Sequence, residues 1–335
     1  MSRAETTSRP RVDTLTSLLT AAVAGALIGF AGAASGPVRG ITAANEVVSA
    51  GIPVARAVMN VAAVVTVGLA LLPVLLGGSR QKLTRPVLAS AQPVAVAASL
   101  LWTVAAGAAL MLQAAEYRPA ALDVTGYVAD IAAGKALVLV VVLALGLVAL
   151  NVVALRRPDT VPAEVRVGLG LFALLPLPVT GHATGWSLHD YASISVELHV
   201  LAAVTWTGGL AAIAAVLGTN RTLLATALPR FSTLATVCLA CVAVTGVFNA
   251  IVELGGDPEL SLPAAVFGTA YGVLVLVKVV CLAGAAALGA HLRRRLLPQV
   301  LRHRRTALAT WAAVELTILG LAFGFAVALS RTPLG

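Results

Sequence analysis

The sequence predicts an all-α protein, a polytopic bundle of about nine transmembrane helices. Hydrophobic residues make up 59 % of the 335-residue chain and charged residues only 11 %, a composition outside the range of soluble domains. Apolar runs of roughly 20 residues, the length of a membrane-spanning helix, recur along the chain. These runs do not alternate with polar residues, and in lipid only helices and closed barrels satisfy the backbone. The fold within the bilayer is therefore expected to be helical.

The nine expected spans are residues 14–34, 54–76, 88–112, 135–155, 166–182, 194–217, 231–252, 266–290 and 308–330. The first lies between MSRAETTSRPR and AGAAS, as in a signal peptide, but its apolar run is longer than a usual signal sequence, so a retained span is expected. Arg or Lys residues lie at the ends of spans two to four, and spans five and six contain histidines. Span seven contains cysteines, span eight a lysine and a cysteine, and span nine a glutamate. We divide the chain into a cytoplasmic tail (1–13), an N-terminal membrane region with spans one to four (14–165) and a second membrane region with spans five to nine (166–335).

The loop charges predict the orientation of the bundle. Seventeen of the 23 Lys and Arg residues fall on the side of the N-terminus: positions 3, 9, 11, 80, 82, 85, 156, 157, 166, 221, 230, 293, 294, 295, 302, 304 and 305. Cytoplasmic loops are enriched in these residues, so the N-terminus is expected in the cytoplasm and the C-terminus outside. The formal charge of +9 then reflects topology and does not indicate nucleic-acid binding. The outer loops are net acidic, which either attracts cations or simply reflects the same bias.

A weak internal repeat appears when the chain is shifted by about 140 residues. Ala62-Ala63-Val64 and Gly68 then fall over Ala202-Ala203-Val204 and Gly208, and Met59 falls over His199. Spans two to five and six to nine would form two parallel four-helix repeats, an arrangement common in transporters. Chance similarity of helices rich in Ala and Val is the alternative.

Two histidines are expected at the same outer end of consecutive spans. His182 ends the fifth span, and His199 lies about 7 Å inside the sixth at 1.5 Å per residue. His189, in the link between these spans, could close over the pair. Ionisable side chains at membrane depth are costly and tend to be functional, and imidazole binds Cu, Zn, Fe or Ni. Interfacial histidines bonded to the backbone are the alternative.

Further polar or aromatic side chains are candidates for a transport path. Glu197 precedes His199, and Trp206 lies two turns below it, where it would form the floor of the site. Lys278 and Glu315 are the deepest charges, and counting from the ends of their spans places them within about one helical turn in depth. They are interpreted either as an ion pair or as a relay through Glu315.

Three cysteines also fall within spans, at Cys238, Cys241 and Cys281. Soft thiolates select Cu(I), but cysteine is also a small apolar residue that is often buried. Both interpretations remain open. No disulfide framework is expected.

Four segments together resemble the CopD family of bacterial copper-resistance membrane proteins. They are GHATG at 181–185, LHVLAAVTWTGGL at 198–210, RFSTLATVCLACVAVTGVFNA at 230–250 and YGVLVLVKVVCLAGAAALGAHLRRRLLP at 271–298. The resemblance implies a copper permease of the bacterial inner membrane, often partnered with the periplasmic copper carrier CopC. It places the family's histidines at His182 and His199, and gives no such support to His189, Met59 or the cysteines. In similar proteins a CtaG-like cytochrome oxidase assembly region follows the CopD-like part.

The expected function is therefore uptake of Cu(I) from the outer face through a histidine site, with no enzymatic activity. No ATP-binding loop is found in the sequence, so movement would follow the copper gradient and the membrane potential. Two alternatives remain. One is a haem b-binding membrane protein, because paired histidines in helical bundles also ligate haem iron. The other is a non-transporting factor for oxidase assembly or copper delivery.

Overall fold

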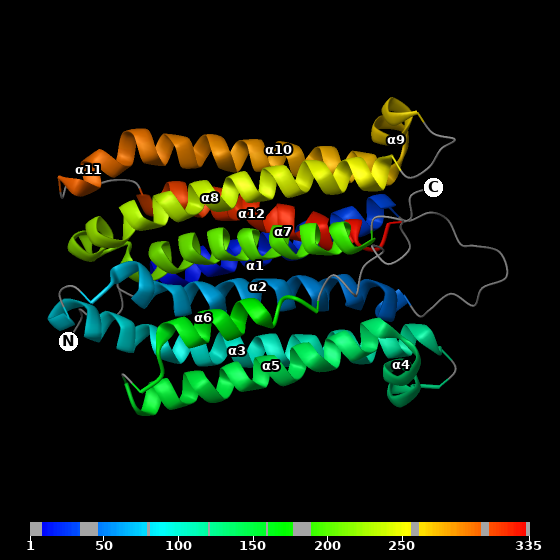
Figure 1. The fold of residues 1–335 in the computed structure, drawn as a ribbon, viewed down its shortest axis with the longest axis horizontal. Helices are drawn as coiled ribbons and strands as arrows, with labels where there is room; N and C mark the ends of the chain where they lie inside the picture. Colours follow the sequence, from blue (N-terminus) through cyan, green and yellow to red (C-terminus); the bar gives the residue numbers. More distant parts are fainter. Residues whose placement is uncertain are drawn as a thin grey trace.

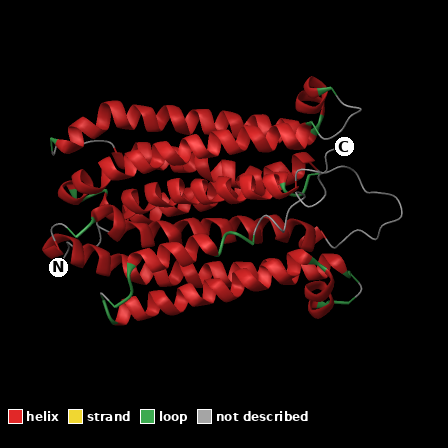
Figure 2. Cartoon of the chain, viewed as in Figure 1, coloured by secondary structure: helices red, strands yellow, loops and turns green. Residues whose placement is uncertain are grey.

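The computed structural model describes residues 9–33, 46–78, 81–119, 121–158, 160–176, 189–255, 261–302 and 308–332, apart from the side chains of residues 9–13 and 189–190. Within these ranges the regular elements are helices and none is a strand (Figure 2). They are α1 (Arg9–Ala33), α2 (Glu46–Leu76), α3 (Gln81–Tyr117), α4 (Val124–Asp130), α5 (Ala132–Arg156), α6 (Ala163–Phe172), α7 (His189–Ala212), the π-helix η3 (Ile213–Leu217), α8 (Arg221–Leu254), α9 (Leu262–Gly268), α10 (Ala270–His291), the π-helix η4 (Leu292–Leu296), α11 (Leu297–Leu301) and α12 (Leu308–Leu329). The predicted all-α fold is confirmed.

Eight of the described helices are long and apolar enough to cross a membrane, and they correspond to all the expected spans except the fifth. That span, 166–182, begins in α6 and continues into residues outside the described ranges. The long helices lie side by side along one axis (Figure 1). The bundle is therefore the polytopic helical membrane fold that the sequence predicts.

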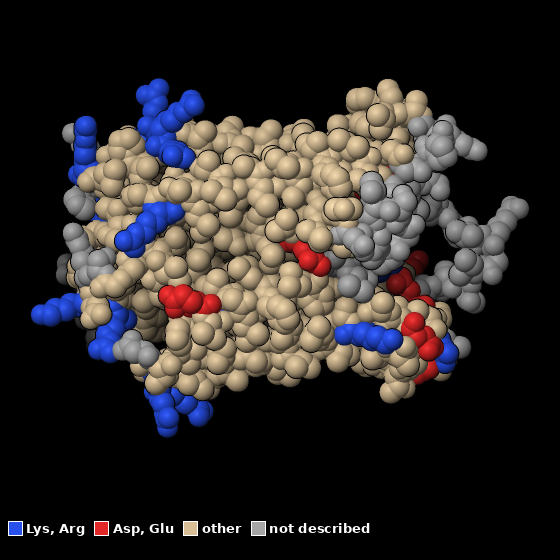
Figure 3. All heavy atoms as spheres, viewed as in Figure 1, with Lys and Arg blue, Asp and Glu red and all other residues tan. Residues whose placement is uncertain are grey.

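The two ends of the bundle differ in charge. On the face drawn in Figure 3, most Lys and Arg side chains gather at the end where α3 begins and α11 ends. We call this the basic end and the opposite one the far end. The helices α2 and α7 run in the same direction, because both end at the basic end.

Two helices form the centre of the bundle. In α2 and α7, 78 % of the most apolar window is buried by other parts of the protein, against 17 % in α8 and 11 % in α10. The backbones of α2 and α7 touch at Gly68 and Gly208, where a Cβ built on Gly68 would lie 2.1 Å from the carbonyl oxygen of Gly208. Only glycine at both positions permits this approach, so these residues determine how closely the two helices pack.

The internal repeat remains a prediction from the sequence, and two short helices lie at positions that agree with it. The short helices α4 and α9 each have seven residues, and their first residues, Val124 and Leu262, are 138 positions apart (262 − 124). Each short helix is followed by a glycine, Gly134 or Gly272, that lies against its backbone; these glycines are also 138 positions apart (272 − 134). We refer to α2–α6 as the first repeat and to α7–α12 as the second. Gly68 and Gly208, which align in the sequence repeat, meet where the two repeats join.

The repeats are packed differently in detail. In the first, α3 packs along α5, whereas in the second α8 and α10 make few contacts and α10 packs along α12 instead. Helix α1, which precedes the repeats, packs along the whole of α12. The second repeat is therefore the more open of the two, and its α12 is held between α1 and α10.

A polar network occupies the first repeat near the basic end. The guanidinium of Arg166 on α6 donates to Gln92 Oε1 on α3 at 3.1 Å and to Asn151 Oδ1 on α5 at 3.4 Å. The amide of Gln92 donates in turn to the backbone carbonyl of Asn151 at 3.0 Å. Arg166 and Asn151 are 7 % and 2 % exposed, so two side-chain amide oxygens replace water at one nitrogen of this buried guanidinium, while its Nε has no partner among the described residues.

Replacing Asn151 by alanine is expected to lower the free energy of unfolding by about 1–3 kcal/mol, because it removes one of the two side-chain acceptors of the buried Arg166 guanidinium and the amide that donates to Ser99 on α3. The measurement is thermal unfolding in detergent. Thr233→Ala is a matched control, since Thr233 is exposed and its hydroxyl bonds only within its own helix. A lowered midpoint in both variants, or in neither, would contradict a network that holds the first repeat together.

Candidate functional site

The predicted histidine cluster is only partly described. His182 and the side chain of His189 lie outside the described residues. His199 is described and is half-buried on α7. The pairing of His182 with His199 therefore remains a prediction. Of this cluster, the structure describes only the surroundings of the His199 side chain.

The imidazole of His199 is held by α8. Its Nδ1 lies 3.0 Å from Thr245 Oγ1, and the Thr245 hydroxyl donates to the carbonyl of Cys241 at 2.6 Å. A threonine hydroxyl has one proton, so in this arrangement Thr245 accepts from Nδ1–H. The lone pair is then on Nε2, the nitrogen that can bind a metal ion. A hydrogen bond of this kind orients ligating histidines in metal sites.

Two neighbours define the space around this ring. A Cβ on Gly246 of α8 would lie 3.3 Å from His199 Cε1, so the ring rests against the backbone of α8. The ammonium group of Lys278 on α10 is near enough for its charge to act on His199. Helices α7 and α8 therefore meet at His199, and Lys278 of α10 lies within electrostatic range.

The predicted ion pair between Lys278 and Glu315 is wrong. Glu315 on α12 lies beside Gly289 of α10, where a Cβ would be 3.6 Å from Glu315 Oε1. Gly289 is eleven residues beyond Lys278 on the same helix, which is about 16 Å at 1.5 Å per residue. The estimate of depth failed because α10 continues through η4 and α11 to Leu301, so the ends of the apolar run do not mark equivalent levels.

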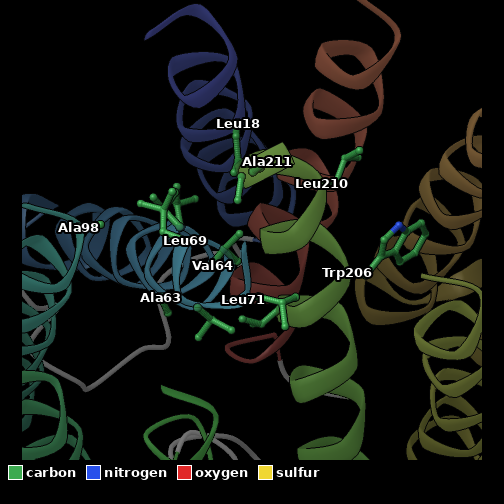
Figure 4. Packing of buried hydrophobic residues seen from close by; sticks show 14 of the residues in the cluster. Leu18, Ala63, Val64, Leu69, Leu71, Ala98, Trp206, Leu210 and Ala211 are labelled. Atoms are coloured by element: carbon green, nitrogen blue, oxygen red, sulfur yellow. The ribbon is translucent and has the colours of Figure 1, made fainter. Parts of the chain in front are cut away.

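The partner of Glu315 is Trp206. The indole N–H of Trp206 donates to the Glu315 carboxyl, and the two residues are 4 % and 2 % exposed. The other carboxyl oxygen, Oε2, is buried and has no partner among the described residues. Figure 4 shows Trp206 projecting from α7 on the side away from Leu18 and Val64. Two residues predicted for the path are thus brought together, about 10 Å along α7 from His199.

Glu197 is separated from this arrangement. It lies two residues before His199 on α7 and is half-buried, and residues two apart on a helix do not face each other. Glu197 and His199 therefore point in different directions.

The cysteines do not form a cluster with these residues. Cys241 donates to the carbonyl of Leu198 on α7 at 3.8 Å, Cys238 is buried and Cys281 is half-buried. Among the described residues, no group of three His, Cys, Asp or Glu side chains is close enough to hold a metal ion.

A polar line on α8 was not anticipated from the sequence. Thr245, Asn249 and Glu253 follow one another at four-residue intervals, so they share one face of α8 and lead from the far end to His199. Asn249 Oδ1 and Glu253 Oε2 are buried and have no hydrogen-bond partner among the described residues. The four-residue spacing within an apolar span is the signal that could have revealed this line.

Comparison with known families assigns both halves of the chain. Residues 47–190 match the model of the copper resistance protein D-like N-terminal domain, and residues 225–329 match that of copper resistance protein D. No curated protein and no solved structure matches the chain. The two family matches follow each other in the sequence. The first includes α2–α6, except for the first residue of α2, and the second includes α8–α12, except for the first four residues of α8. The chain therefore belongs to the CopD family of copper-resistance membrane proteins.

Proposed function

We propose that the protein carries Cu(I) across the bacterial inner membrane, from the far end to the basic end, through the second repeat. The observation that carries this proposal is the contact between His199 and Thr245, because it leaves Nε2 of a histidine inside a span available as a ligand. In this proposal His182 and His189 complete the site with His199. Cu(I) is the substrate of the protein and not a resident cofactor.

The ion would reach His199 along α8. The unpartnered acceptor atoms of Glu253 and Asn249 support this step, because each can replace part of the ion's hydration. Glu197 adds negative charge at the same end of α7. A copper carrier similar to CopC is the expected donor at the far end, and a CtaG-like region is the expected recipient in oxidase assembly.

Release from His199 would be assisted by Lys278. A protonated Lys278 beside the ligand would lower the affinity for a cation, and conduction requires a site that is weak enough to let the ion leave. Further along α7 towards the basic end, beyond Thr205, lies the Trp206–Glu315 pair. The basic end offers the cation no holding site.

We expect the membrane potential to drive uptake, since an inside-negative potential contributes about 2.3 kcal/mol per charge for each 100 mV. Proteoliposomes are loaded so that the compartment facing the basic end can be made negative with potassium and valinomycin. Cu(I) should then accumulate faster than without a potential, and collapse of the potential should slow it.

The matched control is the Met59→Leu variant, because Met59 is the residue that aligns with His199 in the first repeat and leucine nearly keeps its volume. It should take up copper like the wild type, whereas His199→Ala should not. Binding without uptake would refute transport and favour a copper-delivery role at the far end. A haem absorption band in the purified protein would favour a cytochrome instead.

A further inference from the structure

Glu315 is a buried acid whose charge nothing nearby balances. It is 2 % exposed, one of its oxygens accepts from the indole of Trp206, and Oε2 has no partner among the described residues. An ionised carboxylate in such surroundings costs several kcal/mol even after relaxation, and a group so placed takes up a proton instead.

The charged groups on the helices that pack against α12 lie elsewhere. On α10, Lys278 is about 16 Å away along the helix, and the His291 ring stacks on Trp311 at 4.8 Å, one turn of α12 towards the basic end. Arg293 of η4 donates to Thr236 on α8 at 2.7 Å, and Arg294 and Arg295 follow it in η4.

The remaining neighbours of α12 contribute no counter-charge either. Arg56 of α2 donates to Ser330, beyond the far end of α12, and Glu197 and His199 on α7 lie two or more turns from Trp206. The described side chains of α1, residues 14–33, include no ionisable group. Trp206 is thus the one polar side chain shown to contact the Glu315 carboxyl within the described residues.

The repeat indicates that the fold itself does not require an acid here. Gly289, beside Glu315, corresponds to Asn151 in the first repeat (289 − 138 = 151). The charged side chain facing Asn151 is Arg166, and its described hydrogen bonds go to the neutral side chains of Gln92 and Asn151. At the same level of the bundle the first repeat therefore holds a fixed cation, which repels a passing cation, and the second holds an acid.

We propose that Glu315 is the point at which a proton and the transported cation exchange. This proposal rests on the proposed function. Glu315 carries a proton when the path is empty, and that proton leaves to water at the basic end when a cuprous ion arrives. The carboxylate then balances the charge of the ion beside Trp206. When the ion moves on, a proton returns from the same side, so one positive charge crosses per cycle and uptake remains driven by the potential.

The Glu315→Gln variant tests this exchange because the amide keeps the shape of the side chain and the acceptor for Trp206 but cannot lose a proton. Wild-type uptake should rise with pH by up to about tenfold per unit on the acid side of the titration. In Glu315→Gln uptake should fall by at least about tenfold, and this pH dependence should be lost. Copper retention at His199 and the thermal midpoint should stay unchanged, and the exposed Glu46→Gln should behave like wild type throughout.

Infrared difference spectroscopy tests the proton without requiring transport. The wild type should show the carbonyl stretch of a protonated buried carboxyl, which is absent in Glu315→Gln and converts to carboxylate on addition of Cu(I). A pH dependence of uptake that survives in Glu315→Gln, or a carboxyl that is ionised before copper is added, would overturn the proposal. If wild-type protein retains copper but does not transport it, the proposed function fails, while the infrared result still decides the state of Glu315.

Discussion

Purified protein loaded with Cu(I) is expected to retain about one copper ion per chain. The His199→Ala variant should retain none, because the substitution removes the imidazole ligand of the proposed site. Thr245→Val should lie between the two. It keeps the shape of Thr245 but removes the acceptor for Nδ1–H, and loss of such an orienting partner lowers metal affinity by about 10–100-fold. Metal content after gel filtration, followed by competition with a cuprous chelator, measures both effects.

Two further variants make this result specific. Met59→Leu should retain copper as the wild type does, because Met59 is 2 % exposed in the core of the first repeat and leucine nearly keeps its volume while removing the sulfur. His182→Ala should lose copper if the two histidines bind the ion together, as the sequence predicts. Equal retention in His182→Ala and His199→Ala, at the level of the wild type, would exclude the histidine site.

Gly68→Ala is expected to have the largest effect on folding. The added methyl group would lie 2.1 Å from the carbonyl oxygen of Gly208, and backbone cannot move aside as a flexible side chain does. Overpacking usually costs about 1–3 kcal/mol, and a backbone contact at the centre of the bundle should reach or exceed the upper value. The expected result is a low yield of monodisperse protein in detergent and a lowered thermal midpoint.

Gly107→Ala is the matched control for this change. Gly107 lies within α3, and a Cβ there would meet nothing within 4 Å. Alanine is favoured over glycine inside helices by roughly 0.5–1 kcal/mol, so this variant should be as stable as the wild type or slightly more stable. Equal midpoints for Gly68→Ala and Gly107→Ala would mean that α2 and α7 do not meet as described.

The sequence predicts the membrane helices well because the hydropathy of a segment indicates whether lipid or water surrounds it. The contact between Gly68 and Gly208 involves two glycines that the sequence comparison already aligned, although the repeat itself remains a prediction. Contacts between helices were harder to predict. Lys278 and Glu315 were paired by counting from the ends of apolar runs, but α10 extends far beyond its apolar run, and counting along a chain does not say which neighbour a side chain faces.

The polar line on α8 was missed for a related reason. Asn249 and Glu253 look like residues of a span boundary, because polarity near the end of an apolar run usually marks the membrane surface. Only the packing of α8 shows that acceptor atoms of both side chains are buried without a partner. The contact between His199 and Thr245 depends in the same way on the lateral placement of two helices, which hydropathy does not encode.

The meeting of Gly68 with Gly208 also bears on the ancestry of the molecule. In a symmetric homodimer, a residue on the two-fold axis contacts its own copy in the other subunit. Gly68 and Gly208, which align in the predicted repeat, meet in this way within one chain, as would residues on the axis of a dimer whose subunits had been joined by gene fusion. Once joined, the two copies no longer have to carry the same residues. One copy could keep a histidine for copper while the other took methionine at the same place and served as its permanent partner subunit.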